Sequence, residues 1–134
     1  MRVVGWERRL AAAFDAHALM RFSWGIHDCC QMGLDAIEAC TGTRPPILPY
    51  GSEREAARLL RELGGMEAAA QMCCGGAPAI DCALAQRGDL VLVTEPTSMF
   101  GHAFAVCAGR AVLAPAEFGL VEVPAARHVR AWRV

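Results

Sequence analysis

Residues 22–40 read FSWGIHDCCQMGLDAIEAC: a Trp-Gly turn, an acid, two adjacent cysteines and then an apolar helical pattern. Aspartate is a favoured N-cap, so Asp28 predicts a helix that begins at Cys29 and runs to about Cys40. Gly42 and the prolines that follow it end this helix. The residues on one of its faces are small: Gly33, Ala36 and Cys40. A helix with such a face can lie close against a sheet and bring strand residues near Cys29.

Three further segments have the apolar spacing of helices. They are residues 5–20, a stretch that begins after Ser52 and ends at the Gly pair 64–65, and a short segment at 66–72. Ser52 and Glu55 form an S-x-x-E capping box at the start of the second segment. The residues expected on its buried face are Ala56, Leu59, Leu60 and Leu63.

After residue 87 the pattern changes to short apolar runs typical of strands. The five runs are residues 88–93, 102–109, 110–115, 119–124 and 128–134, and the last of them is expected at a sheet edge. Helices followed by strands favour an α+β fold, with N-terminal helices packed on one face of a C-terminal antiparallel sheet of about five strands. Since no linker or repeat interrupts the chain, we expect one domain spanning residues 1–134.

The composition is that of a packed globular domain, with 54% hydrophobic and 20% charged residues. The formal net charge is -1, and no stripe of arginines indicates a nucleic-acid or anionic-membrane partner. No stretch resembles a signal peptide or a membrane span, so we expect a protein made in the cytosol without membrane insertion. The seven cysteines are an odd number, which excludes a complete disulfide framework and favours mostly reduced thiols.

Cys29 stands at a predicted helix start, where unpaired backbone N–H groups and the helix dipole stabilise a thiolate. Its own N–H group is free to donate to an oxyanion. Trp24 and Gly25 are expected to shape the turn that aims Cys29, and Trp24 is a candidate for lining a substrate cleft. The alternative is that Cys29 is only a small buried residue, as free cysteines often are.

Among the four histidines, His102 is the best candidate for a general base. It opens a predicted strand directly after a turn, where a side chain can project from the end of a sheet. His27 is two residues from Cys29 and is expected to point elsewhere. His17 falls within the first helix and His128 starts the edge strand.

A metal site is an alternative use of the cysteines. The residues that would have to converge are His27, Cys29, Cys73, Cys74 and Cys82. The cysteines occur as adjacent pairs, however, whereas zinc sites show pairs spaced C-x(2–4)-C. We therefore expect no metal and no cofactor.

Three motifs occur in a fixed order over roughly residues 20–125: W-G-x-x-D-C before a helix, then R-G-D-L-V, then G-H at a strand start. In this order they resemble the NlpC/P60 cysteine peptidases, and most of all a divergent group encoded in phages and prophages. The resemblance implies a papain-like fold with Cys29 as nucleophile, His102 as general base and Asp89 as a structural acid. It also implies hydrolysis of peptide bonds in bacterial cell-wall stems.

The chain differs from the family pattern at several positions. Phe22 stands where the family has a tyrosine, and Cys30 and Gln31 replace the Ser and Gly after the nucleophile. The family's third catalytic member is a polar residue on the strand after the histidine, where this chain has apolar residues 113–115. Glu117, in the next turn, is the candidate for orienting His102.

The resemblance implies a phage tail-associated cysteine peptidase that acts on peptidoglycan stem peptides. It would be located in the virion tail, or in the bacterial cytoplasm when made from a prophage. The alternative is a structural subunit of a tail tip or baseplate, with the same fold, little or no catalysis and other tail-tip proteins as partners. An acyltransferase or amidase on the same scaffold is a third possibility that the sequence leaves open.

Overall fold

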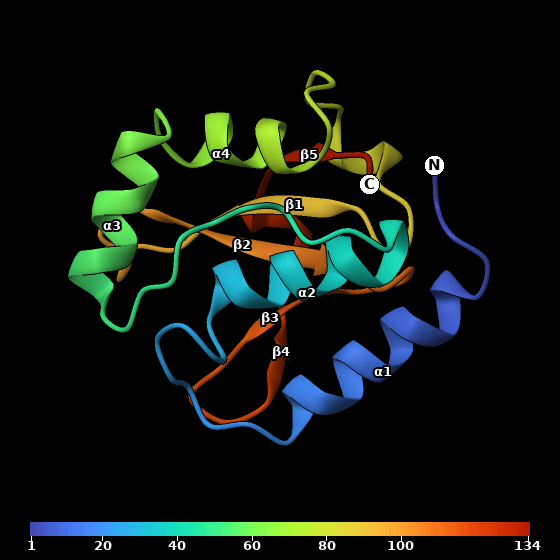
Figure 1. Ribbon diagram of the computed structural model, residues 1–134, viewed down its shortest axis with the longest axis horizontal. Helices are drawn as coiled ribbons and strands as arrows, with labels where there is room; N and C mark the ends of the chain where they lie inside the picture. The colour runs from blue at the N-terminus through green and yellow to red at the C-terminus, as the bar shows by residue number, and fades with distance from the viewer.

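The computed structural model describes residues 1–134, and the first half of the chain is helical (Figure 1). The four α-helices are α1 (Trp6–Ala18), α2 (Cys29–Thr41), α3 (Glu53–Glu62) and α4 (Met66–Cys73). The four predicted helices are therefore confirmed, with small differences at their ends. None of them has both the length and the apolar character that a membrane span requires.

Helix α2 begins and ends where the sequence predicts. Oδ1 of Asp28 accepts a hydrogen bond from the backbone N–H of Gln31 at 2.8 Å, which caps the first turn. Gly42 ends the helix in the left-handed conformation, with φ at 79°. A Cβ atom added to Gly33 would lie only 3.1 Å from Cδ1 of Leu90 on the first strand. The expected close approach of this helix to the sheet is therefore confirmed.

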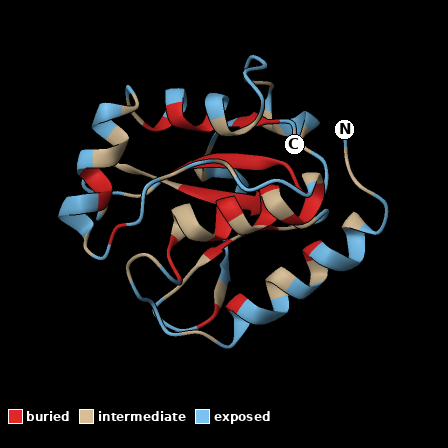
Figure 2. Ribbon diagram, viewed as in Figure 1, coloured by how far each residue is buried: buried red, intermediate tan, exposed pale blue.

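Helix α3 departs from the prediction on its buried face. Oγ of Ser52 accepts from the N–H of Glu55 at 3.1 Å, but the Glu55 carboxylate accepts from Gly51 rather than from Ser52. The buried residues of α3 are Ala56 and Ala57. The leucines of this stretch are only half-buried: Leu59, Leu60 and Leu63. The reason is that α3 packs chiefly on α4, at the edge of the helical layer (Figure 2).

The second half of the chain forms one open antiparallel sheet with the strand order β4-β3-β2-β1-β5. Its strands are β1 (Leu90–Thr94), β2 (His102–Cys107), β3 (Val112–Pro115), β4 (Leu120–Glu122) and β5 (His128–Trp132). Two short 3₁₀ helices, η1 (Cys82–Leu84) and η2 (Ala125–Arg127), lie in the connections. The α+β class, the five strands and the edge position of β5 are confirmed.

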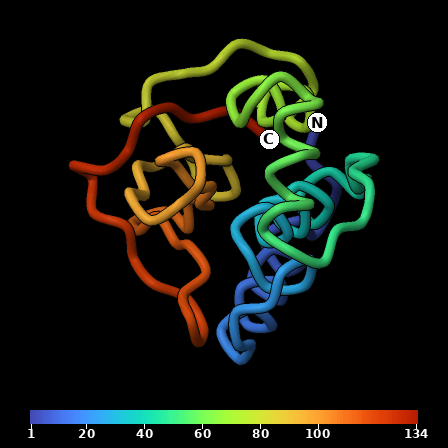
Figure 3. Tube along the Cα trace, turned by 90° about the vertical axis from the view of Figure 1, so that its left-hand side faces the viewer, coloured from blue at the N-terminus to red at the C-terminus, as the bar shows by residue number.

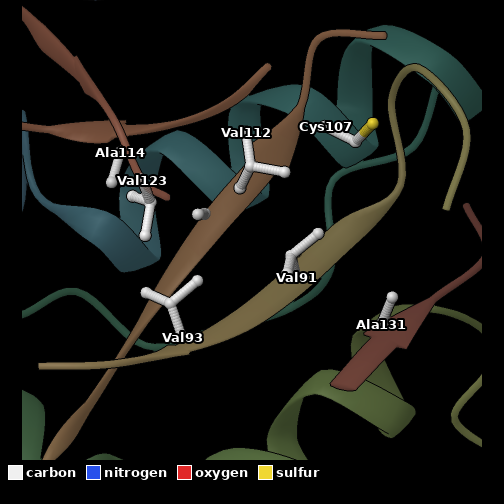
Figure 4. Packing of buried hydrophobic residues seen from close by; sticks show 8 residues of the cluster. Val91, Val93, Cys107, Val112, Ala114, Val123 and Ala131 are labelled. Carbon is white, nitrogen blue, oxygen red and sulfur yellow. The ribbon is translucent and has the colours of Figure 1, made fainter. Parts of the chain in front are cut away.

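The helices gather on one side of the sheet, as the side view shows (Figure 3). On this side α2 packs on β2, and α4 covers the neighbouring part of the sheet. Side chains alternate along β1, so Leu90 and Leu92 face the helices while Val91 and Val93 face the opposite side. The opposite face carries a cluster of small and branched side chains (Figure 4): Val91, Val93, Ala105, Cys107, Val112, Ala114, Val123 and Ala131.

Asp89, in the turn before β1, is buried and joins the two ends of the chain. Its carboxylate accepts hydrogen bonds from Arg2 Nη2 at 3.0 Å and from the backbone N–H groups of Gln86 at 2.8 Å and Val134 at 3.1 Å. Nε of Arg2 also donates to the Val134 carbonyl at 2.9 Å. This geometry gives Asp89 a structural role.

Candidate active site

A cleft of about 460 Å³ opens where β1 ends and β2 begins, beside the start of α2. Its volume is typical of small-ligand sites, which range from about 300 to 1,000 Å³. The cleft brings together residues that the sequence singled out in separate segments: Trp24, Asp28, Cys29, His102 and Glu117. Gly25 lies in the turn that leads to α2.

Cys29 is the first residue of α2 and is half-buried in the cleft wall. The pKa of its thiol is lowered, chiefly by a hydrogen bond from the thiol of Cys30. The backbone N–H groups of Phe104 and Cys30 also lower this pKa, while burial and the Asp28 carboxylate oppose the shift. The N–H of Cys29 itself donates to no backbone carbonyl, because the first turn of a helix offers none. Cys29 therefore has the surroundings of a nucleophile.

Cys30 lies between the cleft and the apolar layer formed by α2, α3 and α4. Its hydrogen bond to Cys29 and its burial raise its pKa well above the usual value of a thiol. Of the two adjacent cysteines, Cys29 is thus the one whose pKa is lowered.

Asp28 is fully buried, and its hydrogen bonds connect the turn, α2 and the loop between α2 and α3. Its carboxylate accepts from the N–H of Gly25 at 2.7 Å and from that of Gln31 at 2.8 Å. The hydroxyl of Tyr50 donates to it, with its oxygen 2.8 and 2.9 Å from the two carboxylate oxygens. Burial, with the nearby Cys30 and Asp28, raises the pKa of Tyr50, so its hydroxyl stays protonated. No local pattern in the sequence signals this contact across 22 residues.

The turn before Asp28 depends on Gly25. Its φ is +82°, and an added Cβ atom would lie 2.1 Å from the carbonyl oxygen of Tyr50. The ring of Trp24 meets that of Phe22 edge to face, with the centroids 5.0 Å apart and the planes at 86°. Both rings line the cleft, so Phe22 and Trp24 supply an apolar wall.

His102 opens β2 and lies half-buried in the cleft. Its Nδ1 lies 3.0 Å from the carbonyl oxygen of Phe100. A carbonyl can only accept a hydrogen bond, so Nδ1 carries a proton, and in the neutral ring the lone pair is on Nε2. His102 and Cys29 share the cleft without a hydrogen bond between them.

Glu117 lies exposed at the cleft and its carboxylate makes no hydrogen bond. Its backbone carbonyl instead accepts from the N–H of Phe22 at 2.8 Å. The structure thus differs from the expectation that Glu117 orients His102, because the Phe100 carbonyl does so. Sequence motifs record only side-chain identities. A backbone carbonyl that contacts His102 therefore cannot be recognised from the sequence.

The other three histidines point away from Cys29. Nδ1 of His17 and Nδ1 of His27 lie 2.7 Å apart in the interior, and Nε2 of His128 donates to the Val123 carbonyl at 2.8 Å. The expected orientation of His27 away from Cys29 is confirmed.

No group of three or more His, Cys, Asp or Glu side chains converges on a position that could hold a metal ion. All seven cysteines are free thiols, and Cys40 and Cys107 are buried in the core. Both ring nitrogens of His27 are engaged by His17 and the Gly119 carbonyl, so they are not available beside Cys29.

The remaining wall of the cleft is apolar with a charged rim. The rim includes Glu53, Glu95 and Arg127. Nη2 of Arg127 lies 2.9 Å from Oε2 of Glu95, and this ion pair fixes the loop between β1 and β2. A thiol of lowered pKa, a free helix N–H and an imidazole of fixed tautomer are together suited to acyl transfer.

A family model described as a domain of unknown function (DUF6950) matches residues 1–134, the full length of the sequence. No curated protein matches the chain. The chemistry of the cleft is therefore inferred from the residues that line it.

Proposed function

This chain belongs to the DUF6950 family, and we propose that it is a cysteine hydrolase of the papain-like NlpC/P60 type, which cleaves peptide bonds in bacterial cell-wall stems. One observation carries the proposal: Cys29, at the start of α2, and His102, at the start of β2, line the same cleft. The lowered pKa of Cys29 and the fixed tautomer of His102 add to it.

The reaction divides the chemistry between these groups. Nε2 of His102 takes the thiol proton, and the sulfur of Cys29 attacks the carbonyl carbon of the scissile bond. The backbone N–H of Cys29 donates to the oxyanion that forms. His102 then returns the proton to the leaving amine as the C–N bond breaks, which leaves a thioester. A water molecule, deprotonated by Nε2, attacks the thioester, releases the acid and restores the thiol.

The free protein lacks a direct bond between Cys29 and His102, which is compatible with this chemistry. Catalytic hydrogen bonds are often long in substrate-free enzymes and tighten when substrate binds. The half-buried positions of both side chains at one cleft leave room for that adjustment.

The papain-like architecture and the setting are parts of the same proposal. The support for them is the order of the motifs and the packing of a cysteine-bearing helix start on a sheet whose second strand opens with histidine. The enzyme would act from a phage or prophage tail on peptidoglycan stem peptides.

The test is incubation with soluble peptidoglycan fragments that carry stem peptides, followed by mass spectrometry of the products. Wild-type protein should release peptides, Cys29→Ala should release none, and His102→Ala should be slower by about 10²–10⁴-fold. Cys73→Ala is the matched control, because this half-buried thiol lies outside the cleft. Intact fragments after incubation with stoichiometric wild-type protein would overturn the proposal.

A structural subunit of a tail tip is the second candidate, and one observation favours it. Large apolar side chains are exposed on two paired segments beside the cleft: Leu19 at 80%, Ile26 at 63% and Phe118 at 62%. The segments are joined by hydrogen bonds from Phe22 to Glu117 and from Gly119 to Met20. In this role Leu19→Ser and Phe118→Ser would weaken a complex with tail-tip proteins, whereas Cys29→Ala would leave it intact.

A further inference from the structure

A hydrogen-bonded chain of polar side chains, with two buried imidazoles at its centre, lies directly behind the turn that presents Cys29. Nε2 of His17, on α1, lies 2.6 Å from Oδ2 of Asp35, on α2. Nδ1 of His17 lies 2.7 Å from Nδ1 of His27, in the turn. Nε2 of His27 donates to the carbonyl of Gly119 at 3.0 Å. Both imidazoles are almost wholly shielded from solvent, with exposed fractions of 1% and 0%.

The number of protons in this chain follows from its hydrogen bonds. Each of the three contacts needs one proton, and the Gly119 carbonyl and an ionised Asp35 supply none. The two imidazoles must therefore hold three protons on four nitrogens, which gives the pair a single positive charge. The half-buried Asp35 carboxylate balances that charge, so the two imidazoles and Asp35 together are neutral.

The positive charge belongs on His17. His17 contacts the Asp35 carboxylate directly, whereas His27 contacts a neutral carbonyl. Burial lowers the pKa of His27, and the charge of His17 lowers it further, against the Gly119 hydrogen bond and the Asp28 carboxylate. Burial alone would raise the pKa of Asp35, but the hydrogen bonds from His17 and Arg44 outweigh it and lower that pKa.

We propose that His17 is a buried imidazolium that acts as a positioning residue for the turn bearing Cys29. It donates from both ring nitrogens, to Asp35 and to His27, and His27 in turn donates to Gly119. These hydrogen bonds thus connect α1, the turn, α2 and the β3–β4 connection.

Three of these segments line the cleft: the turn, the start of α2 and the β3–β4 connection. The N–H of Gly119 donates to the Met20 carbonyl at 2.8 Å, and the connection that holds Gly119 also carries the cleft residue Glu117. His27 precedes Asp28 and Cys29 in the turn. Loss of the hydrogen bonds made by His17 and His27 would therefore move the sulfur of Cys29 relative to the N–H groups that lower its pKa.

The charges that face these side chains come from α2, from the loop after α2, which carries Arg44, and from the turn. On α2, Asp35 is bound by Nη1 of Arg44 at 2.5 Å, and Arg44 also binds Glu38 at 3.0 Å. In the turn, Asp28 faces His27. These groups keep Asp35 ionised, and none of them offers His27 a partner for a second proton. A proton added to His27 would place two imidazolium nitrogens 2.7 Å apart and break the chain.

The test is the protonation state of each histidine, read from ¹⁵N chemical shifts and their pH titration in protein labelled with ¹⁵N-histidine. At pH 7.5, His17 should show two protonated ring nitrogens and His27 one. A His17 with an unprotonated nitrogen at this pH would overturn the proposal, and this readout needs no variant.

The positioning role is tested with Asp35→Asn. This variant should return His17 to a neutral imidazole and slow the alkylation of Cys29 by about tenfold, since one pKa unit is a tenfold change in thiolate. Glu38→Gln is the matched control, because it removes the other carboxylate on Arg44 and should leave both readouts unchanged. An altered His17 with unchanged alkylation of Cys29 would contradict the positioning role.

The role of His17 in positioning Cys29 rests on the proposed function. Its tests, however, measure protonation and alkylation and do not use hydrolysis. A protein that cleaves no stem peptide can still show the imidazolium and its effect on the thiol. Failure of the peptidase proposal and failure of this inference are therefore distinguishable.

Discussion

Nδ1 of His102 lies 3.0 Å from the carbonyl oxygen of Phe100, in the turn that leads into β2. The candidate base is thus oriented by its own turn and not by a side chain from another strand. In a catalytic triad the third member holds the imidazole in the correct tautomer. Here a backbone carbonyl contacts the ring nitrogen, whereas the residues at positions 113–115 are apolar.

Replacement of His102 separates catalysis from stability. His102→Gln should reduce hydrolysis by about 10²–10⁴-fold, because the amide cannot act as a general base. The free energy of unfolding should change by less than about 1 kcal/mol, because the side chain is half-exposed and makes one hydrogen bond. Urea unfolding and product release measured on one preparation check both. An equal loss of stability and activity would mean that His102 is only structural.

The turn before α2 predicts a large effect at Gly25. Gly25→Ala should lower the free energy of unfolding by about 2–5 kcal/mol: about 1–2 for the left-handed backbone and about 1–3 for the contact with Tyr50. Gly5→Ala is the matched control, since Gly5 has a φ of +79° but no atom within 4 Å of the added Cβ. Gly5→Ala should lower the free energy of unfolding only by the backbone contribution of about 1–2 kcal/mol. Similar losses in the two variants would contradict the close packing of Gly25 on Tyr50.

The hydroxyl of Tyr50 stabilises the buried Asp28 carboxylate. Tyr50→Phe should cost about 1.5–3 kcal/mol in the free energy of unfolding, the range for a hydrogen bond to a charged group. Thr97→Val removes a hydroxyl that donates to the Glu95 carboxylate at 2.7 Å on the surface, and should cost less than about 0.5 kcal/mol. Chemical denaturation of both variants is the measurement. A loss in Tyr50→Phe no larger than that in Thr97→Val would contradict the importance of this contact.

The lowered pKa of His27 predicts loss of stability in mild acid. Below about pH 6.5 the unfolded chain takes up a proton at His27 that the folded chain does not, so the free energy of unfolding falls as pH falls. The contribution of His27 is fully present above about pH 6.5 and is lost toward the lowered pKa, with a slope of at most about 1.4 kcal/mol per pH unit. Urea unfolding between pH 5 and 7.5 should give a smaller slope for His27→Gln. An unchanged slope would show that His27 titrates normally.

Local signals in the sequence predicted the frame of this protein. Asp28 and Gly42 mark the two ends of α2 because both act within one helical turn. The change of period after residue 87 predicted all five strands, since alternating burial along a strand leaves a local pattern. The cap, the turn glycine and the strand start also placed Cys29 and His102 correctly on their elements.

Contacts that depend on tertiary packing were not predictable in this way. The hydroxyl of Tyr50 and the pair of His17 and His27 meet their partners only after α1, α2 and the loop have packed. The Phe100 carbonyl was missed for a different reason, because every residue carries a carbonyl and only its geometry makes it a partner. The leucines of α3 are less buried than their spacing indicates because the helix packs away from the sheet.

The proposed function requires Cys29 to be an activated nucleophile, and the pH dependence of its alkylation is the sharpest test of this. Iodoacetamide modification of each cysteine is followed by mass spectrometry in the wild type, Cys30→Ala and Cys30→Ser. Cys29 should react first of the seven, with a midpoint below the usual thiol value of about 8.5. Cys30→Ala should raise the midpoint, because it removes the hydrogen-bond donor. Cys30→Ser should keep the midpoint low, because the serine hydroxyl can still donate. A Cys29 that is unreactive in the folded protein, or that titrates at or above about 8.5, would contradict the account.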